Sequence, residues 1–192
     1  MQNSKLTIQK REFISYKLLN SFFGGIAMGT VFTIYGELNP SVFSIGGIAL
    51  AIGLLVVAKL YTKIINIEYF YKISMAVEAV MLFAVIYFLL FPYNYTTALL
   101  VYIGYQFTFV FGGYLIRAET VFLSRAKILS FLDVAKQKGY LAGMFFAYVF
   151  YKGLEYLDIT SNQEHVYNIH FFLLVIQIGI IYILQKSFKK SI

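Results

Sequence analysis

Residues 40–63, PSVFSIGGIALAIGLLVVAKLYTK, combine an apolar run long enough to cross a bilayer with a basic end. The run from Val42 to Ala58 contains no charged residue, and Lys59 and Lys63 follow it directly. A helix needs about 20 mainly apolar residues to span the hydrocarbon core of a membrane. Because short loops rich in Lys and Arg are retained in the cytoplasm, the end at Lys59 and Lys63 is predicted to be cytoplasmic.

The same pattern of apolar runs and basic gaps extends over the whole chain. Apolar continuity and turn signals predict six spans, at 19–37, 42–61, 71–91, 97–116, 139–157 and 166–186. Fifteen of the 16 Lys and Arg residues fall before the first span, after the last one, or in alternate gaps between them. The other gaps contain none, so we expect a multi-pass protein of the inner (cytoplasmic) membrane with both termini cytoplasmic.

The composition agrees with a membrane protein and argues against several other classes. With 60% hydrophobic residues and a mean hydropathy of +0.74, the 192-residue chain is too apolar for an ordinary soluble domain. The net charge of +7 is explained by the basic gaps, so no nucleic-acid partner is expected. The chain has no cysteine and none of the common catalytic motifs, and we therefore expect no enzyme activity, no cofactor and no metal site.

The predicted domain organisation is one membrane domain between two short cytoplasmic segments. Residues 1–18 form the N-terminal segment, residues 19–186 the six-helix domain, and residues 187–192 a basic tail. Between the fourth and fifth spans, residues 118–138 carry apolar side chains at helical spacing among basic ones. This pattern predicts an amphipathic helix on the cytoplasmic membrane surface.

The distribution of small residues predicts which spans pack centrally. Four spans carry Gly, Ala, Ser or Thr at intervals of about four residues, as in Gly25 and Gly29 of the first span and Gly139 and Gly143 of the fifth. Small residues at this spacing let helix backbones approach closely in lipid. Spans 1, 2, 4 and 5 are therefore expected in the centre, and spans 3 and 6 towards lipid.

At this point the sequence resembles one half of a major facilitator superfamily transporter. Gly53 followed by Lys59 and Lys63 is similar to the family's loop motif after its second helix, with Val57 in the place of the motif's acid. The start of the fifth span, Gln137 to Gly143, is similar to the family's glycine-rich fifth helix. The resemblance implies an all-α fold of six spans, with helices 1 and 4 lining the solute pathway.

Glu78 is an acid within the third predicted span. Glu78 lies about 10 Å inside the third span, at about 1.5 Å per residue, where an ionisable group needs a partner. Arg117, at the inner end of the fourth span, is the expected partner. The pair is either a structural ion pair or a coupling site for a proton or a substrate.

Lys152 is the one base outside the basic clusters. It either pairs with Glu155 or with Glu37 as a structural contact, or binds an anionic substrate, or forms a proton-linked switch with Glu37. Gln106 lies near the middle of the fourth span, and the resemblance places that span on the pathway. Gln106 is therefore the first candidate for substrate contact, against a plain interhelical hydrogen bond.

The function predicted from the sequence is solute translocation by a half-transporter. One such half cannot alternate access alone, so a parallel homodimer or a membrane-protein partner in the lipid bilayer is expected, with a small-molecule substrate. Two alternatives stay open. The first is a non-transporting accessory or scaffold subunit of a membrane complex. The second is the substrate-binding subunit of an energy-coupling-factor-type transporter.

Overall fold

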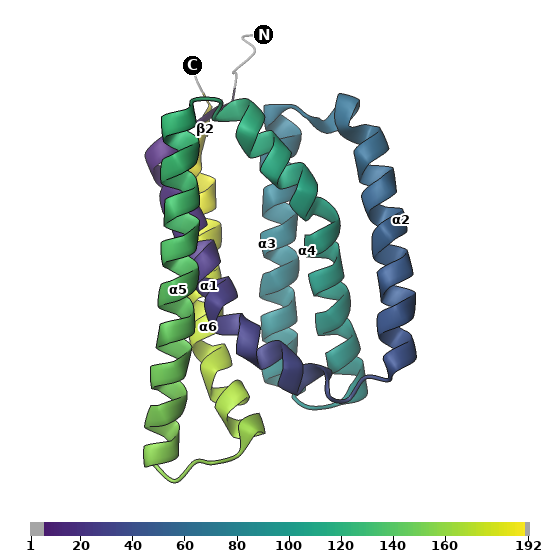
Figure 1. Cartoon of the computed structure of the whole chain (residues 1–192), viewed down its shortest axis with the longest axis vertical. Helices are drawn as coiled ribbons and strands as arrows, with labels where there is room; N and C mark the ends of the chain where they lie inside the picture. Colours follow the sequence, from purple (N-terminus) through teal and green to yellow (C-terminus); the bar gives the residue numbers. More distant parts are fainter. Residues whose placement is uncertain (1–5, 191–192) are drawn as a thin grey trace.

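The computed structural model describes residues 6–190 and shows an all-α fold built from six long helices (Figure 1). The helices are α1 (Lys10–Tyr35), α2 (Pro40–Ile64), α3 (Ile67–Leu90), α4 (Tyr95–Phe122), α5 (Ala126–Tyr156) and α6 (Asn162–Ser187). Their starts follow from local chemistry. Asn66 and Asn94 accept hydrogen bonds from the backbone N–H groups of Tyr69 and Thr97, and Pro40 opens α2.

Five helices, α1, α2, α3, α4 and α6, are long and apolar enough to cross a membrane. The chain therefore has the helices of a multi-pass membrane protein. The expected fifth span lies in α5, which has 31 residues but is less apolar. Tyr and Gly residues, together with Lys152 and Glu155, lower its apolar content, and its crossing of the membrane stays a prediction.

The segment expected as a separate surface helix, residues 118–138, is divided between two long helices. Helix α4 continues to Phe122, and α5 begins at Ala126 and runs without a break to Tyr156. Leu132 and Ala135 do not face a membrane surface but are buried in the stripe that continues to Gly139 and Gly143. The apolar spacing in this segment therefore reflects packing of α5 along α1.

The first and last described segments pair at one end of the bundle. Strands β1 (Leu6–Ile8) and β2 (Phe188–Lys190) form a short antiparallel ladder, with Leu6 opposite Lys190. This ladder was not predicted from the sequence, and helix α1 begins well before the expected boundary at residue 19. The α2–α3 and α4–α5 connections lie at this end as well (Figure 1), and the helix ends that flank them carry most of the other basic residues.

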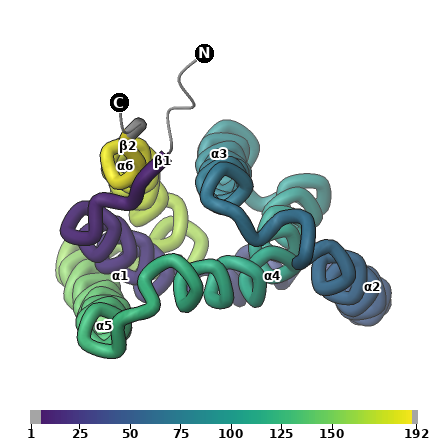
Figure 2. Tube along the Cα trace, turned by 90° about the horizontal axis from the view of Figure 1, so that it is seen from above, coloured from purple at the N-terminus to yellow at the C-terminus, as the bar shows by residue number. Residues whose placement is uncertain are grey.

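Contacts between the helices follow a repeat of two three-helix units, α1–α3 and α4–α6. Helix α1 packs on α5 and α6, and α4 packs correspondingly on α2 and α3, while α3 and α6 pack on each other. Figure 2 shows α1, α5 and α6 on one side and α4 and α2 on the other. Exchanging α1 with α4, α2 with α5 and α3 with α6 reproduces these contacts. Because each unit has three helices, successive units run in opposite directions, as in inverted repeats.

The expected division into central and peripheral helices is wrong for three of the six. Helices α3 and α6 carry long buried stripes, whereas α2 buries Val57 alone among its described residues. Bulky side chains such as Phe70, Phe88, Ile169 and Ile180 fill the space between neighbouring helices. A Cβ at Gly47 of α2 would meet nothing within 4 Å, so this glycine faces outward.

Candidate functional site

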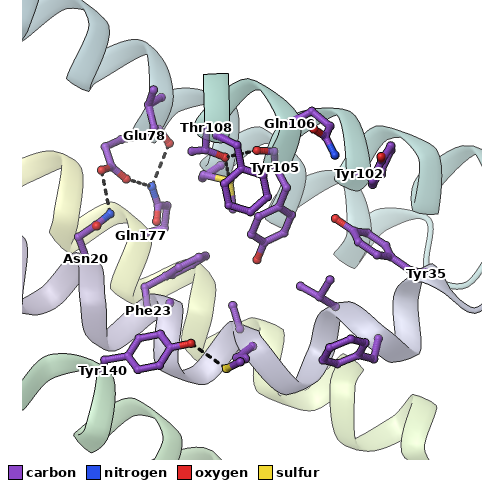
Figure 3. A pocket seen from close by; sticks show the side chains of 18 residues that line it. Asn20, Phe23, Tyr35, Glu78, Tyr102, Tyr105, Gln106, Thr108, Tyr140 and Gln177 are labelled. Atoms are coloured by element: carbon purple, nitrogen blue, oxygen red, sulfur yellow. Dashed lines mark hydrogen bonds between the residues drawn. The ribbon is translucent and has the colours of Figure 1, made fainter. Parts of the chain in front are cut away.

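A cavity of about 430 Å³ opens between α1 and α4, with α3 and α6 behind it (Figure 3). This volume lies in the range of pockets that hold small molecules, roughly 300–1,000 Å³. Its polar and aromatic lining comes from all helices except α2, and comprises Asn20, Phe23, Phe32, Tyr35, Glu78, Tyr102, Tyr105, Gln106, Thr108, Phe109, Tyr140 and Gln177. Helices α1 and α4 contribute most of the lining residues.

One end of the cavity is built around the carboxylate of Glu78. Glu78 lies eleven residues after the start of α3 and twelve before its end, so it sits at the middle of the helix. Its side chain is 2% exposed. The Tyr16 hydroxyl donates to Oε1 at 2.7 Å, and Asn20 Nδ2 donates to the same oxygen at 2.9 Å. The other oxygen, Oε2, accepts from Gln177 Nε2 at 2.8 Å.

Gln177 is held in one orientation by two acceptors on α3. Its Nε2 donates to the carboxylate of Glu78 and also, at 2.9 Å, to the backbone carbonyl oxygen of the same residue. The amide oxygen therefore points away from both. Among the described residues no donor reaches Gln177 Oε1, although it is buried. A buried acceptor without a donor is costly, and it marks a place where a ligand group can bind.

The other end of the cavity is aromatic. The Tyr35 and Tyr102 rings meet edge to face at 5.4 Å, and Tyr105 lies between them and Thr108 in the close-up (Figure 3). The Thr108 hydroxyl donates to backbone carbonyl oxygens of its own helix, so it is already satisfied. Gln106 also lines the cavity, and its buried Oε1 has no partner in the described part of the chain.

A second buried carboxylate, Glu119, lies near the basic end of α4. It forms ion pairs with Lys17 of α1 at 2.5 Å and with Lys136 of α5 at 2.7 Å. A smaller cavity of about 280 Å³ extends from this ion cluster towards the first cavity. The two cavities share four lining residues, and these are Asn20, Val77, Glu78 and Thr108. Glu78 therefore lies where the two cavities meet.

The structure brings two of the five candidates from the sequence into the cavity, Gln106 and Glu78. The prediction that Arg117 pairs with Glu78 is wrong. Arg117 is exposed, and its guanidinium lies 5.4 Å from the centre of the Tyr61 ring. Arg117 is exposed on α4, whereas Glu119, two residues later, is buried. Glu78 is instead held by neutral donors.

The remaining two candidates, Lys152 and Glu37, lie outside the cavity. Lys152 Nζ pairs with Glu155 Oε2 at 2.6 Å, and both side chains are largely exposed. This contact is the structural alternative considered from the sequence. Glu37 is exposed just after α1.

Sequence reasoning missed Tyr16 and Asn20, which donate to Glu78, and Glu119, which organises the ion cluster. Tyr16 lies among polar and basic residues, and the sequence therefore placed it in the cytoplasmic segment 1–18. The available signal was helical spacing, since Phe13, Tyr16 and Asn20 follow one face of α1.

Comparison of the chain with protein-family models, with curated proteins and with solved structures gave no match. The class that the fold itself defines is an all-α protein with five helices able to span a membrane and a cavity between α1 and α4.

Proposed function

We propose that this protein binds a small solute in the cavity between α1 and α4 and moves it across the membrane as a half-transporter. The observation that carries the proposal is the cavity itself, with the buried carboxylate of Glu78 at the middle of α3. Ionisable groups at this depth mark substrate or ion pathways in membrane proteins. Solute sites between repeated units near the bilayer midplane are typical of secondary transporters.

The repeat of two three-helix units supports a kinship with half of a major facilitator transporter. In this proposal a six-helix unit rocks against a second unit, because alternating access needs two bodies. The second unit is another copy in the same orientation or a different membrane protein. Helix α2 supports such pairing, since nearly all of its apolar surface lies outside the bundle.

Orientation is tested with single cysteines, since the chain has none of its own. Ser41→Cys and Asn94→Cys, at the end opposite the termini, should react with a membrane-impermeant thiol reagent added outside intact cells. Ser130→Cys, in the first turns of α5, should react only after the membrane is opened. Labelling of Ser130→Cys from outside would contradict cytoplasmic termini.

Translocation is tested by the accessibility of the cavity from the two sides. Gln106→Cys should react with a small charged thiol reagent in right-side-out vesicles and in inverted vesicles, because alternating access exposes the cavity to each side in turn. Ile178→Cys, on α6 outside the cavity, is the control and should react in neither. Reactivity of Gln106→Cys from one side only would favour a binding or accessory subunit over a transporter.

A further inference from the structure

The two buried carboxylates of this fold differ in how their charge is balanced. Glu119 is neutralised by Lys17 and Lys136, which both lie within 2.7 Å. Glu78 is as deeply buried, with 2% of its side chain exposed, yet its described partners are the neutral side chains of Tyr16, Asn20 and Gln177. The two bases that line the smaller cavity with Glu78, Lys17 and Lys136, are already bound to Glu119.

The pattern of donors around Glu78 suits an ionised carboxylate. A carboxylate is an acceptor only, and Glu78 accepts three side-chain hydrogen bonds. A charge in this position is costly without an opposite charge nearby. A cation that enters the cavity would supply the missing opposite charge.

The rest of the cavity also favours a cation. Of the described residues that line it, none is Lys, Arg or His. Aromatic rings from Phe23, Tyr35, Tyr105 and their neighbours form much of its wall, and ring faces attract cations. The unpaired oxygens of Gln106 and Gln177 are hydrogen-bond acceptors, which suit N–H donors of a ligand.

We propose that the cavity binds an organic cation, a protonated amine on an apolar body, with the ammonium group beside Glu78 and Gln177 and the body among the tyrosines. This inference rests on the proposed solute site and names its substrate class. The volume of about 430 Å³ accommodates one small molecule of this kind. The N–H groups of the amine donate to Glu78 and to Gln177 Oε1, so an amine is preferred over a quaternary ammonium of the same shape.

Four compounds with one apolar cage test the charge requirement. They are 1-aminoadamantane, which is a cation at pH 7, N,N,N-trimethyl-1-adamantylammonium, 1-adamantanol and 1-adamantanecarboxylate. Binding to the purified full chain in lipid nanodiscs is measured by equilibrium dialysis and by the shift in thermal unfolding. The amine should bind at least about tenfold more tightly than the alcohol or the carboxylate, with the quaternary cation between them.

Variants on α3 test the role of Glu78. Glu78→Gln should reduce the affinity for the amine at least about tenfold and leave the affinity for the alcohol unchanged. Glu68→Gln is the matched control, because Glu68 is exposed in the first turn of the same helix. Glu78→Asp retains the charge and should still bind the amine more tightly than the carboxylate. If Glu78→Gln does not fold, this variant tests whether the cavity binds cations, and loss of the preference would overturn the proposal.

The outcomes separate this inference from the proposed function. Equal binding of all four compounds, or an amine affinity unchanged in Glu78→Gln, would overturn the cation site while the cavity stays a solute site. The cation site would also be overturned if none of the four compounds bound at a concentration of about 10 mM, which is high enough to detect weak binding. Binding in detergent that is lost in lipid nanodiscs would assign the cavity to acyl chains. The two-sided reactivity of Gln106→Cys reports on translocation independently of all these results.

Discussion

The interface of α1 with α5 and the corresponding interface of α4 with α2 are formed in different ways. In the first, backbone meets backbone, because a Cβ at Gly139 or Gly143 would overlap the carbonyl oxygen of Leu18 or Phe22. In the second, side chains separate the helices, since Gly53 faces Val110 and Gly46 faces the Tyr102 ring. The repeat thus contains one close interface and one loose interface.

This difference shows what small residues do in a membrane helix. Glycines at a spacing of four allow close approach when the facing helix presents its own backbone, and the close contact then contributes packing energy. On α2, glycines such as Gly47 meet no facing backbone and leave the helix exposed. Helix α2 therefore leaves most of its apolar surface outside the bundle.

The largest effect is expected when the close interface is broken. Gly143→Leu places a branched side chain against the backbone of Phe22 and Ile26, so α1 and α5 must separate. We expect a loss of more than about 3 kcal/mol, seen as poor accumulation and early thermal unfolding in detergent. Gly47→Leu on α2 is the matched control and should fold normally. Equal behaviour of the two variants would contradict the difference between the interfaces.

A somewhat smaller effect is expected at the ion cluster that ties α4 to the close interface. Glu119→Gln leaves Lys17 of α1 and Lys136 of α5 without their shared acceptor. Removing one partner from a buried ion cluster costs about 3–5 kcal/mol, towards the lower end here because Lys136 is partly exposed. Thermal unfolding measures this loss, and adding Lys136→Met should recover part of it. No recovery would mean that Lys136 contributes little.

A substitution in the loose interface should be tolerated better. Gly53→Ala brings a Cβ to 2.7 Å from Val110 Cγ2, and a side chain can rotate where a backbone cannot. We expect a loss of about 1 kcal/mol, measured against Gly139→Ala in the close interface, which should lose more. The reverse order would show that α2 is held more tightly than its exposure indicates.

The smallest effect is expected at Lys152, on the outer part of α5. Its ion pair with Glu155 is exposed and lies outside the cavity, so Lys152→Met should leave folding and amine binding unchanged. The double variant Lys152→Met/Glu155→Gln should behave in the same way. Loss of binding or transport in a stably folded Lys152→Met would restore Lys152 as a functional residue.

Part of the candidate site could be predicted from single residues. Glu78 and Gln106 are polar residues within apolar runs. Because burying a polar side chain in the membrane is unfavourable, their positions alone indicate functional candidates. The partner of Glu78 could not be predicted, because Tyr16, Asn20 and Gln177 come from α1 and α6, remote in sequence. Arg117 and Glu119 are two residues apart, so helix rotation alone decides which of them faces inward.

The sequence by itself determined the all-α class, the apolar helices and the collection of basic residues at one end, because these follow from local composition and periodicity. The small-residue pattern also placed the first and fifth spans among the closely packed ones, and Gly25, Gly139 and Gly143 do meet backbone. The tertiary structure decided which small faces find a partner, why α3 and α6 are buried, and which carboxylate has cations. The physical reason is that helix–helix contacts depend on shape complementarity between surfaces distant in sequence, which no local pattern encodes.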